Sequence, residues 1–283
     1  MDYKAIGFKA GLEIHQQLDT HKLFCQCPSK IMEKADYFFQ RMLRPTQSEL
    51  GDVDRAALEE AQRKRRFFYT ASGTSTCLVE ADEEPPHAAN EEAIDICLTI
   101  AILLGAKPVD EMQFMRKIVI DGSNTTGFQR TALVAMNGSL NKVRITSLAL
   151  EEDAARKLTE KDKLVNYGLD RLGMPLIEIT TAADITDPEH AREVAEQLGL
   201  LLQATKKVKR GLGTIRQDLN ISIAKGARIE VKGIQSLSAI SKVAENETLR
   251  QIGVLEIAET LQKRAKKSDL AYIQSVELIH QST

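Results

Sequence analysis

The stretch AGLEIHQQLDTHKLFCQC, residues 10–27, combines a strand pattern with chemically versatile side chains. Successive side chains of a strand point to opposite faces, so Glu13 and His15 share one face while Leu12 and Ile14 share the other. Two closely spaced cysteines follow directly. The pattern is compatible with a metal site, a catalytic strand or the polar edge of a sheet.

The bulk composition predicts a folded, soluble, cytoplasmic protein. Of 283 residues, 43% are hydrophobic and 28% charged, which is enough to bury a core and unlike a disordered chain. The net charge of −2 lacks the basic excess of a compact nucleic-acid-binding domain. Four irregularly spaced cysteines argue against a disulfide framework. The longest apolar run, residues 94–104, is too short to span a bilayer, so we expect no membrane partner.

The expected elements alternate between strands and helices. Apolar periodicity predicts a helix over residues 90–104, and we expect further helices over residues 186–205 and 238–266. Strand-like patterns cover residues 4–18, 67–78, 111–121, 128–150, 176–180, 213–224 and 228–231. Strands joined both by hairpins and by helices indicate an α+β fold with mixed and antiparallel sheets.

Local signals set the boundaries of these elements. We expect residues 23–27 to pair with the first strand as a hairpin and Asn137-Gly138 to form a turn. Thr186 and Glu189 fit a capping box, and Pro188 suits a first helical position.

Four of the predicted strands carry charged or amide side chains at every second position. Residues two apart on a strand are about 6.5–7 Å apart, a practical spacing for two side chains that converge on an ion or a phosphate. Antiparallel sheets also often have one wet face, so both interpretations stay open. The residues on these faces are Glu13, His15 and Gln17; Glu178; Arg216, Asp218, Asn220 and Ser222; and Arg228, Glu230 and Lys232.

The segment LEEDAARKL places Glu151, Glu152 and Asp153 side by side. Adjacent carboxylates repel one another unless a cation neutralises them. Mg²⁺ prefers one or two carboxylates together with waters and substrate phosphates. The alternative is an acidic helix N-terminus, where the dipole rewards each charge by about 0.3–1 kcal/mol.

The cysteines supply half of a possible zinc site. Cys25 and Cys27 form C-x-C, whereas a closed zinc site needs two further ligands. Cys77 is available, but Thr74 stands where a C-x-x-C pair would have its other thiolate. Cys97 lies on the apolar face of the predicted helix. We therefore expect no closed zinc site.

Several motifs together resemble the B/E family of glutamyl-tRNA(Gln) amidotransferase subunits, and the resemblance covers essentially the whole chain. MRKI and DGSNTTGFQRT are similar to the archaeal E branch rather than to the bacterial B branch. The other motifs, in family order, are GLEIHQQLDTHKLFCQC, LEEDAARKL, DRLGMPLIEITTAADITDPEHA, GLGTIRQDLNISI and RIEVKGIQSL.

The resemblance implies a glutamine-synthetase-like catalytic cradle domain over residues 1–283, without the synthetase-like insertion and the helical and tail domains of the family. In the family this domain uses ATP and Mg²⁺ to phosphorylate the γ-carboxylate of Glu-tRNA(Gln). Ammonia then displaces phosphate from the γ-phosphoryl-Glu-tRNA intermediate. The implied partners are the family's asparaginase-like D subunit, which releases the ammonia in a hetero-oligomer of D and E chains, and the acceptor end of the tRNA.

The resemblance also implies roles for individual residues. His15, Glu151 and Glu178 match metal ligands, although imidazole is an unusual ligand for Mg²⁺. Glu13 matches a carboxylate that orients ammonia or takes its proton, and Glu152 could replace Glu151 because the two are adjacent. Glu13, His15 and Glu152 are thus the catalytic candidates.

The nucleotide side of the site falls on two later strands. Arg216 and Lys232 are expected to contact phosphates, and Asp218 or Glu230 to reach a second metal. The matching nucleotide-binding residues are Arg216, Asp218, Asn220, Glu230 and Lys232. Some bacterial members bind zinc through C-x-C and C-x-x-C, a pattern that Thr74 interrupts here.

Two other functions compete with catalysis. The chain could be a non-catalytic piece that docks the asparaginase-like partner and the tRNA acceptor end, or a free-standing carboxylate–amine ligase for a small acid. A chain that only docks its partners would not need the matching metal ligands His15, Glu151 and Glu178, yet all three are intact. The second disagrees with the joint match of all the motifs.

Overall fold

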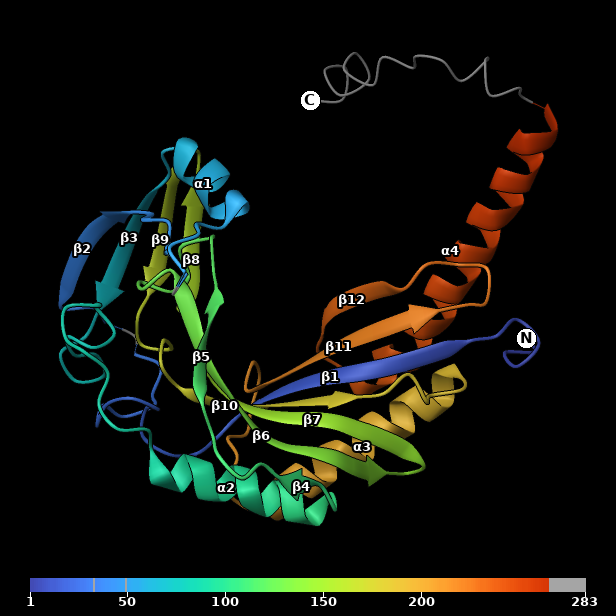
Figure 1. Ribbon diagram of the computed structural model, residues 1–283, viewed down its shortest axis with the longest axis horizontal. Helices are drawn as coiled ribbons and strands as arrows, with labels where there is room; N and C mark the ends of the chain where they lie inside the picture. The colour runs from blue at the N-terminus through green and yellow to red at the C-terminus, as the bar shows by residue number, and fades with distance from the viewer. Residues whose placement is uncertain (33, 49, 265–283) are drawn as a thin grey trace.

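The computed structural model describes residues 1–32, 34–48 and 50–264. Its larger sheet has eight strands, all paired antiparallel. They are β1 (Lys9–Gln17), β4 (Lys107–Pro108), β5 (Phe114–Ile118), β6 (Phe128–Leu140), β7 (Val143–Glu152), β10 (Pro175–Thr181), β11 (Ile215–Ser222) and β12 (Ile229–Ile234). The spatial order is β12-β11-β1-β10-β7-β6-β4, with β5 also pairing with β6 (Figure 1). β1 therefore lies inside the sheet.

A smaller sheet of four strands stands at one end of the large sheet (Figure 1). It runs β2-β3-β9-β8, with β3 and β9 parallel and the other pairs antiparallel. Its strands are β2 (Tyr37–Met42), β3 (Arg66–Ala71), β8 (Arg156–Lys161) and β9 (Leu164–Gly168). One antiparallel and one mixed sheet, together with helices, confirm the predicted α+β class.

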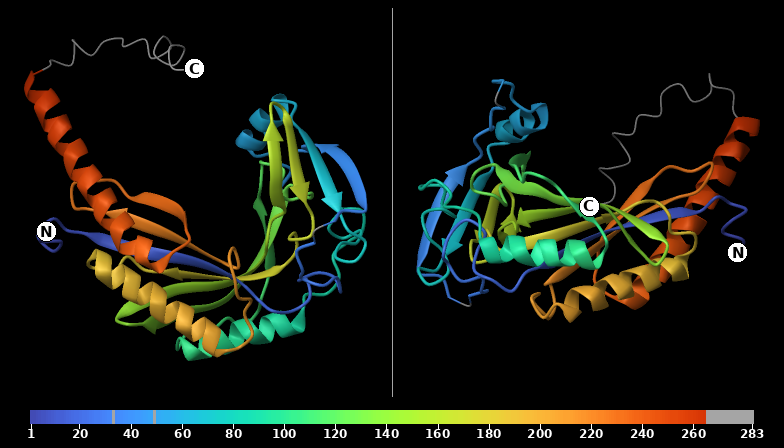
Figure 2. Two further views of the ribbon diagram at one scale, coloured as in Figure 1. Left: turned by 180° about the vertical axis from the view of Figure 1, so that it is seen from behind. Right: turned by 60° about the horizontal axis from the view of Figure 1, so that its bottom comes forward.

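Four helices complete the described part of the fold: α1 (Arg55–Gln62), α2 (Glu91–Leu103), α3 (Pro188–Ala204) and α4 (Leu237–Arg264). Both α2 and α3 lie along one side of the large sheet, and α4 packs near β11 (Figure 2). Leu12 and Ile14 of β1 are almost fully buried in the core that includes these helices. Because side chains alternate along a strand, Glu13 and His15 point to the opposite face of the sheet.

No helix in the described part of the chain has both the length and the apolar character needed to cross a bilayer. The predicted helix end at residue 266 and the predicted domain end at residue 283 lie outside the described residues.

The starts of two helices follow their capping residues. The side chain of Asn90 accepts a hydrogen bond from the Ala93 amide and begins α2, as predicted for residue 90. Pro188 occupies the first turn of α3, also as predicted. The capping side chain is Asp187 rather than Thr186, and it accepts the His190 amide at 2.9 Å. Because a proline at the first helical position makes its predecessor the cap, the Thr186–Glu189 capping box is one residue out of place.

Residues 23–27 do not form the predicted hairpin with β1. Both edges of β1 are already paired, with β10 on one side and β11 on the other. Residues 23–27 instead form hydrogen bonds with the residues just before α2. Leu23 O accepts a hydrogen bond from the Asn90 amide at 2.8 Å, and Phe24 O accepts one from the His87 amide at 3.0 Å.

Asn137-Gly138 is also not the predicted turn, since both residues lie within β6. The chain reverses at Asn141 and Lys142, which both adopt positive φ. At position 138 a Cβ atom would lie 2.9 Å from Leu104 O, at the end of α2. The glycine therefore permits close packing of helix on strand rather than a reversal of the chain.

Candidate active site

Strand register aligns the polar residues of β1 with those of its two neighbours. His15 lies opposite Glu178 of β10 and Arg216 of β11. Glu13 lies opposite Asp218 of β11. Directly opposed residues on antiparallel strands have Cβ atoms about 4.5–5.5 Å apart, so these side chains form two adjacent rows on one face.

Glu13, His15, Glu151 and Glu178 form what we call the carboxylate cluster. His15 Nε2 lies 3.2 Å from Glu178 Oε2 and 3.6 Å from Glu13 Oε1. It lies 3.9 Å from Glu151 Oε2, on β7. The structure thus brings together the three predicted metal ligands and the predicted ammonia-facing carboxylate. They come from the neighbouring strands β1, β10 and β7.

Lys117 of β5 adds a cation that the sequence did not point to. Its Nζ lies 3.2 Å from Glu151 Oε1 and 3.7 Å from Glu178 Oε2. Opposite Lys117 on β6, Gln129 donates a hydrogen bond to Glu151 Oε2 at 3.1 Å. Lys117 lies beside Glu151 and Glu178 only because β5 pairs with β6 and β6 pairs with β7. The MRKI motif that contains it was its only sequence signal.

The electrostatics of the cluster reflect crowded carboxylates. Burial and the neighbouring Glu178 raise the pKa of Glu13. Burial also acts to raise the pKa of Glu178, but the hydrogen bond and charge of His15, with Lys117, outweigh it and lower that pKa to about 2. Burial opposes the charge on Lys117, yet Glu151 and Glu178 raise its pKa. Glu178 and Lys117 are therefore charged at neutral pH.

The donor set fits a divalent cation. Glu13, His15 and Glu178 each offer a ligand atom within 4.8 Å of the others. Three carboxylates, those of Glu13, Glu151 and Glu178, surround the imidazole of His15, and the ammonium of Lys117 lies beside two of them. Carboxylate oxygens are the ligands that Mg²⁺ prefers, and the imidazole would be the unusual member.

A second group of acids adjoins the cluster and shares Glu13. Carboxylate oxygens of Glu13, Asp218 and Glu230 lie within 4.8 Å of one another. Lys232 Nζ lies 3.0 Å from Glu230 and 3.6 Å from Asp218, while the Gly233 amide donates to Asp218 at 2.7 Å. The two acids that the sequence predicted near a second metal, Asp218 and Glu230, are thus neighbours of Glu13 in the structure.

The remaining predicted nucleotide residues lie on β11. Arg216 Nη1 donates to the buried Asp153 at 3.2 Å, and Gln17 donates to the other Asp153 oxygen at 2.9 Å. Asp153 thereby orients Arg216, a positioning role that sequence analysis missed although it noted the acidic triplet. Asn220 lies opposite Gly11 on β1 and Glu230 on β12, at the far end of the same face.

Glu152 does not join the carboxylate cluster. It follows Glu151 on β7, so its side chain takes the opposite face. Its carboxylate accepts hydrogen bonds from the Arg130 amide at 2.9 Å and from Arg130 Nη1 at 3.1 Å. Of the two adjacent acids that the sequence could not separate, Glu151 is the one that lies beside His15. This placement does not support a catalytic role for Glu152.

Comparison with known proteins identifies the family of the chain. Residues 8–280 match the family model described as the GatB/GatE catalytic domain. The chain belongs to the GatB/GatE catalytic domain family. This confirms the resemblance that the motifs indicated.

Curated relatives from archaea are close in sequence to this GatB/GatE catalytic domain. The E subunit of the glutamyl-tRNA(Gln) amidotransferase of Thermococcus sibiricus is 56% identical over 272 residues, which cover 95% of this chain and 43% of the relative. The E subunits from Saccharolobus islandicus and Aeropyrum pernix are 55% and 54% identical, over 95% and 98% of this chain and 43% and 44% of the relatives. The chain therefore spans less than half the length of these relatives.

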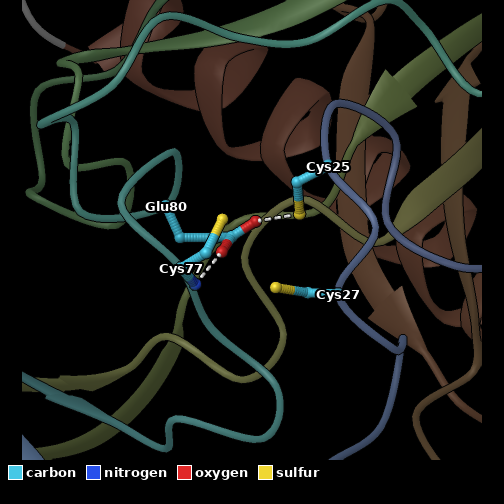
Figure 3. Close-up of side chains that lie close together, drawn as sticks. All are labelled: Cys25, Cys27, Cys77 and Glu80. Carbon is cyan, nitrogen blue, oxygen red and sulfur yellow. Dashed lines mark hydrogen bonds between the residues drawn. The ribbon is translucent and has the colours of Figure 1, made fainter.

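The GatB/GatE domain carries a second side-chain cluster, which we call the thiol cluster: Cys25, Cys27, Cys77 and Glu80 (Figure 3). All four cysteines of the chain are free of disulfide bonds. Burial and the Glu80 charge raise the pKa of Cys25 and Cys27, the latter to about 11. Sequence analysis found only part of a donor set here, whereas a fourth donor atom lies beside the three sulfur atoms. Glu80, three residues after Cys77, supplies the fourth donor that was sought at Thr74.

Proposed function

We propose that the chain is the catalytic part of an ATP- and Mg²⁺-dependent glutamyl-tRNA(Gln) amidotransferase, which converts Glu-tRNA(Gln) to Gln-tRNA(Gln). The observation that carries this proposal is the convergence of Glu13, His15, Glu151 and Glu178 from three neighbouring strands. Membership of the GatB/GatE family and the names of the archaeal relatives support it.

The proposed chemistry removes the obstacle to amide formation. A carboxylate is a poor acyl donor because oxide is a poor leaving group. Transfer of the γ-phosphoryl group of ATP to an oxygen of the glutamyl γ-carboxylate gives ADP and an acyl phosphate. Ammonia then attacks the acyl carbon, the carbon–oxygen bond to phosphate breaks, and inorganic phosphate leaves. Stabilisation of charge during the phosphoryl transfer is mainly electrostatic work.

The residues of the chain divide this work. His15, Glu151 and Glu178 would hold Mg²⁺, which when bound neutralises phosphate charge. A second ion would lie near Asp218 and Glu230. Arg216, fixed by Asp153, would contact phosphate oxygens.

Two more cations and one acid complete the proposed roles. Lys232 and Lys117, both about half exposed or more, would also contact phosphates. Glu13 borders both groups of acids and would orient the ammonia or accept its proton. Asn220 lies on the nucleotide side by register alone.

The proposed partners follow from the reaction. Ammonia would come from the asparaginase-like D subunit in a hetero-oligomer, and the tRNA would present its acceptor end to the carboxylate cluster. The net charge of −2 suits a part that handles this end rather than the polyanionic body of the tRNA. We place the reaction in the cytoplasm, where aminoacylated tRNA is used.

One assay tests the proposal directly. Full-length protein is combined with its asparaginase-like partner, Glu-tRNA(Gln), asparagine, ATP and Mg²⁺, and formation of Gln-tRNA(Gln) is measured. Formation that depends on ATP and on Mg²⁺ supports the proposal. Undiminished formation with Glu178→Gln and with His15→Ala would show that the metal assignment is wrong.

A second assay separates catalysis from docking. The chain alone is tested for ATP hydrolysis that Glu-tRNA(Gln) stimulates. Stimulated hydrolysis supports a catalytic domain, whereas binding of the tRNA without hydrolysis favours a docking role.

A further inference from the structure

A cavity lies at the carboxyl end of β1, next to the row of polar side chains that forms the candidate active site. Its volume is about 590 Å³, within the range of about 300–1,000 Å³ that is usual for ligand sites. Three segments line it: the end of β1, residues 29–31, and the loop of residues 206–214 between α3 and β11. We call this cavity the basic pocket, because Lys206, Lys209 and Arg210 belong to its lining.

The positive charge of the basic pocket is only partly compensated. Lys206 and Arg210 are exposed, and neither forms an ion pair with another residue that the structure describes. Burial lowers the pKa of Lys209 to about 8, although nearby aspartates act in the opposite direction. An anion bound in the pocket would favour the charged form of this lysine.

Ser29 gives a second, independent indication of a ligand. It lines the basic pocket, and only 7% of its surface is exposed. Its hydroxyl oxygen is buried and has no hydrogen-bond partner among the described residues. A buried hydroxyl without a partner costs free energy. An oxygen atom of a bound anion would supply the missing partner.

Backbone hydrogen bonds hold the 206–214 loop against the end of β1. The Gln17 amide donates to Thr214 O at 2.9 Å, and the Lys209 amide donates to Gln17 O at 3.0 Å. The Asp19 amide donates to Lys207 O at 2.8 Å. The loop that carries the cations is therefore in place before a ligand arrives, which lowers the entropic cost of binding.

The basic pocket continues the polar row of β1 away from the carboxylate cluster. Gln17 lines the pocket and lies on the same face of β1 as His15. It also donates to Asp153, which fixes Arg216. Gln17 and Asp19 follow His15 by two and four residues, which corresponds to about 7 and 13 Å along an extended chain.

We propose that the basic pocket binds phosphates of the single-stranded 3′ end of the tRNA. This inference rests on the proposed function, because it requires the glutamyl γ-carboxylate to lie at the carboxylate cluster. About ten covalent bonds, each extending the chain by about 1.2 Å, separate that carboxyl carbon from the phosphorus on the 5′ side of the terminal adenosine. The resulting reach of about 12 Å matches the separation between His15 and the pocket.

The phosphates of ATP fit this position less well. About four bonds separate the γ-phosphorus from the α-phosphorus of ATP, so the two atoms are about 5 Å apart. Because the γ-phosphoryl group must reach the same carboxylate, all three phosphates lie near the carboxylate cluster. The more distant part of ATP is the uncharged adenosine. Cations at the far end of the row suit a polynucleotide, which carries a charge at every residue.

Binding of two RNA stem-loops to the chain tests the inference without catalysis. One copies a tRNA acceptor stem with its unpaired 3′ CCA end, and the other lacks the unpaired nucleotides. Fluorescence anisotropy gives both dissociation constants in the absence of ATP. We expect the CCA stem-loop to bind about tenfold more tightly, with a salt dependence that is steeper by about 0.7 for each added phosphate contact.

Two variants locate the contacts. Lys206→Ala and Arg210→Ala change exposed side chains, so both proteins should fold. Each should weaken binding of the CCA stem-loop about five- to tenfold, reduce its salt slope by about 0.7 and leave the trimmed stem-loop unaffected. Lys207→Ala is the matched control and should keep wild-type affinity. Lys207 is exposed and adjacent to Lys206, but its Nζ lies 2.9 Å from Glu92 and outside the pocket.

Three results would overturn the inference. The first is a wild-type chain that binds both stem-loops equally or binds neither. The second is a Lys207→Ala variant that loses as much affinity for the CCA stem-loop as Arg210→Ala does. The third is an Arg210→Ala variant that binds ATP with Mg²⁺ about as much more weakly as it binds the CCA stem-loop, which would assign the pocket to the nucleotide.

Failure of the proposed function would look different. In that case the chain would bind the CCA stem-loop through Lys206 and Arg210, although the full-length protein formed no Gln-tRNA(Gln).

Discussion

The carboxylate cluster and the thiol cluster use similar ingredients in different settings. Each gathers acids or thiols around one point, and each has a lysine ammonium within 4 Å of a carboxylate. The carboxylate cluster lies on adjacent strands of one sheet, and its Lys117 is about half exposed. The thiol cluster lies in loops, and its Lys22 is fully buried.

The difference shows that the burial of a cluster affects whether it can react with a substrate or only stabilise the fold. A site on neighbouring strands holds its groups rigidly while one side stays open to solvent and substrate. A site enclosed by loops holds the loops together but leaves no room for a reacting molecule. Variants of the first cluster should therefore change rates more than stability, and variants of the second should change stability more than rates.

The largest effect is expected from Glu178→Gln. It removes the carboxylate nearest to His15 and a proposed ligand, so Gln-tRNA(Gln) formation should fall by about 10³-fold. The free energy of unfolding should also fall, by about 1–3 kcal/mol, because His15 and Lys117 lose the charged partner whose pKa they lower to about 2. Glu193→Gln, exposed on α3, is the control. A rate within threefold of wild type would contradict the assignment.

Glu151→Gln and Glu152→Gln form an isosteric pair that sharpens the comparison. The first should lower the rate by about 100-fold with little loss of stability. The second should lower the free energy of unfolding by about 1–3 kcal/mol, because Arg130 loses its charged partner. Burial raises the pKa of Glu152 despite Arg130, so the loss stays below that of a fully favourable buried pair.

Rate assays and urea unfolding of both variants decide this point. The reverse order, with Glu152→Gln the slower enzyme and Glu151→Gln the less stable protein, would return the catalytic role to Glu152.

Lys117→Met should strengthen the binding of Mg²⁺ but lower the rate of the ATP-dependent reaction. Without the ammonium the carboxylate cluster is one charge more negative, so Mg²⁺ should bind about three- to tenfold more tightly. The ATP-dependent rate should fall about tenfold, because a phosphate contact is lost. Titration of ATP hydrolysis with Mg²⁺ measures both. Weaker Mg²⁺ binding by the variant would mean that Lys117 supports the cation site instead of competing with it.

Asp184→Asn should give the smallest effect. It serves as the reference against which the variants of both clusters are compared. A hydrogen bond from Arg144 lowers the pKa of Asp184 to about 2. A lowered carboxyl pKa stabilises the fold above the ordinary pKa near 4, and this contribution disappears as the pH falls toward 2. Arg144 is largely exposed, so screening by solvent keeps this contribution small.

The difference in unfolding free energy between wild type and Asp184→Asn, measured from pH 7 to pH 2, should shrink toward zero. A difference in unfolding free energy that grows as the pH falls would contradict this prediction.

Much of the fold follows from local pattern, and the failures share one cause. Asn90 and Pro188 mark the starts of α2 and α3 because capping depends only on neighbouring residues. The hairpin at residues 23–27 failed because other strands already occupied both edges of β1. Gly138 was mistaken for a turn residue because its real constraint, contact with Leu104 O, comes from a distant helix.

The order of amino acids is enough to establish which side chains share a face. The period of two along a strand places Glu13 with His15 and separates Glu151 from Glu152, whatever the neighbouring strands are. Family motifs added the expectation that these residues serve one reaction.

Which of these faces meet depends on the folded arrangement of the strands and loops. Lys117 reaches Glu151 through the pairing of β5, β6 and β7, and Glu80 reaches Cys25 across 55 residues of chain. Strand register and loop docking arise from the burial of the whole core, which no short window of sequence contains. For that reason most residues of the candidate site could be named in advance, whereas Lys117 and Glu80 could not.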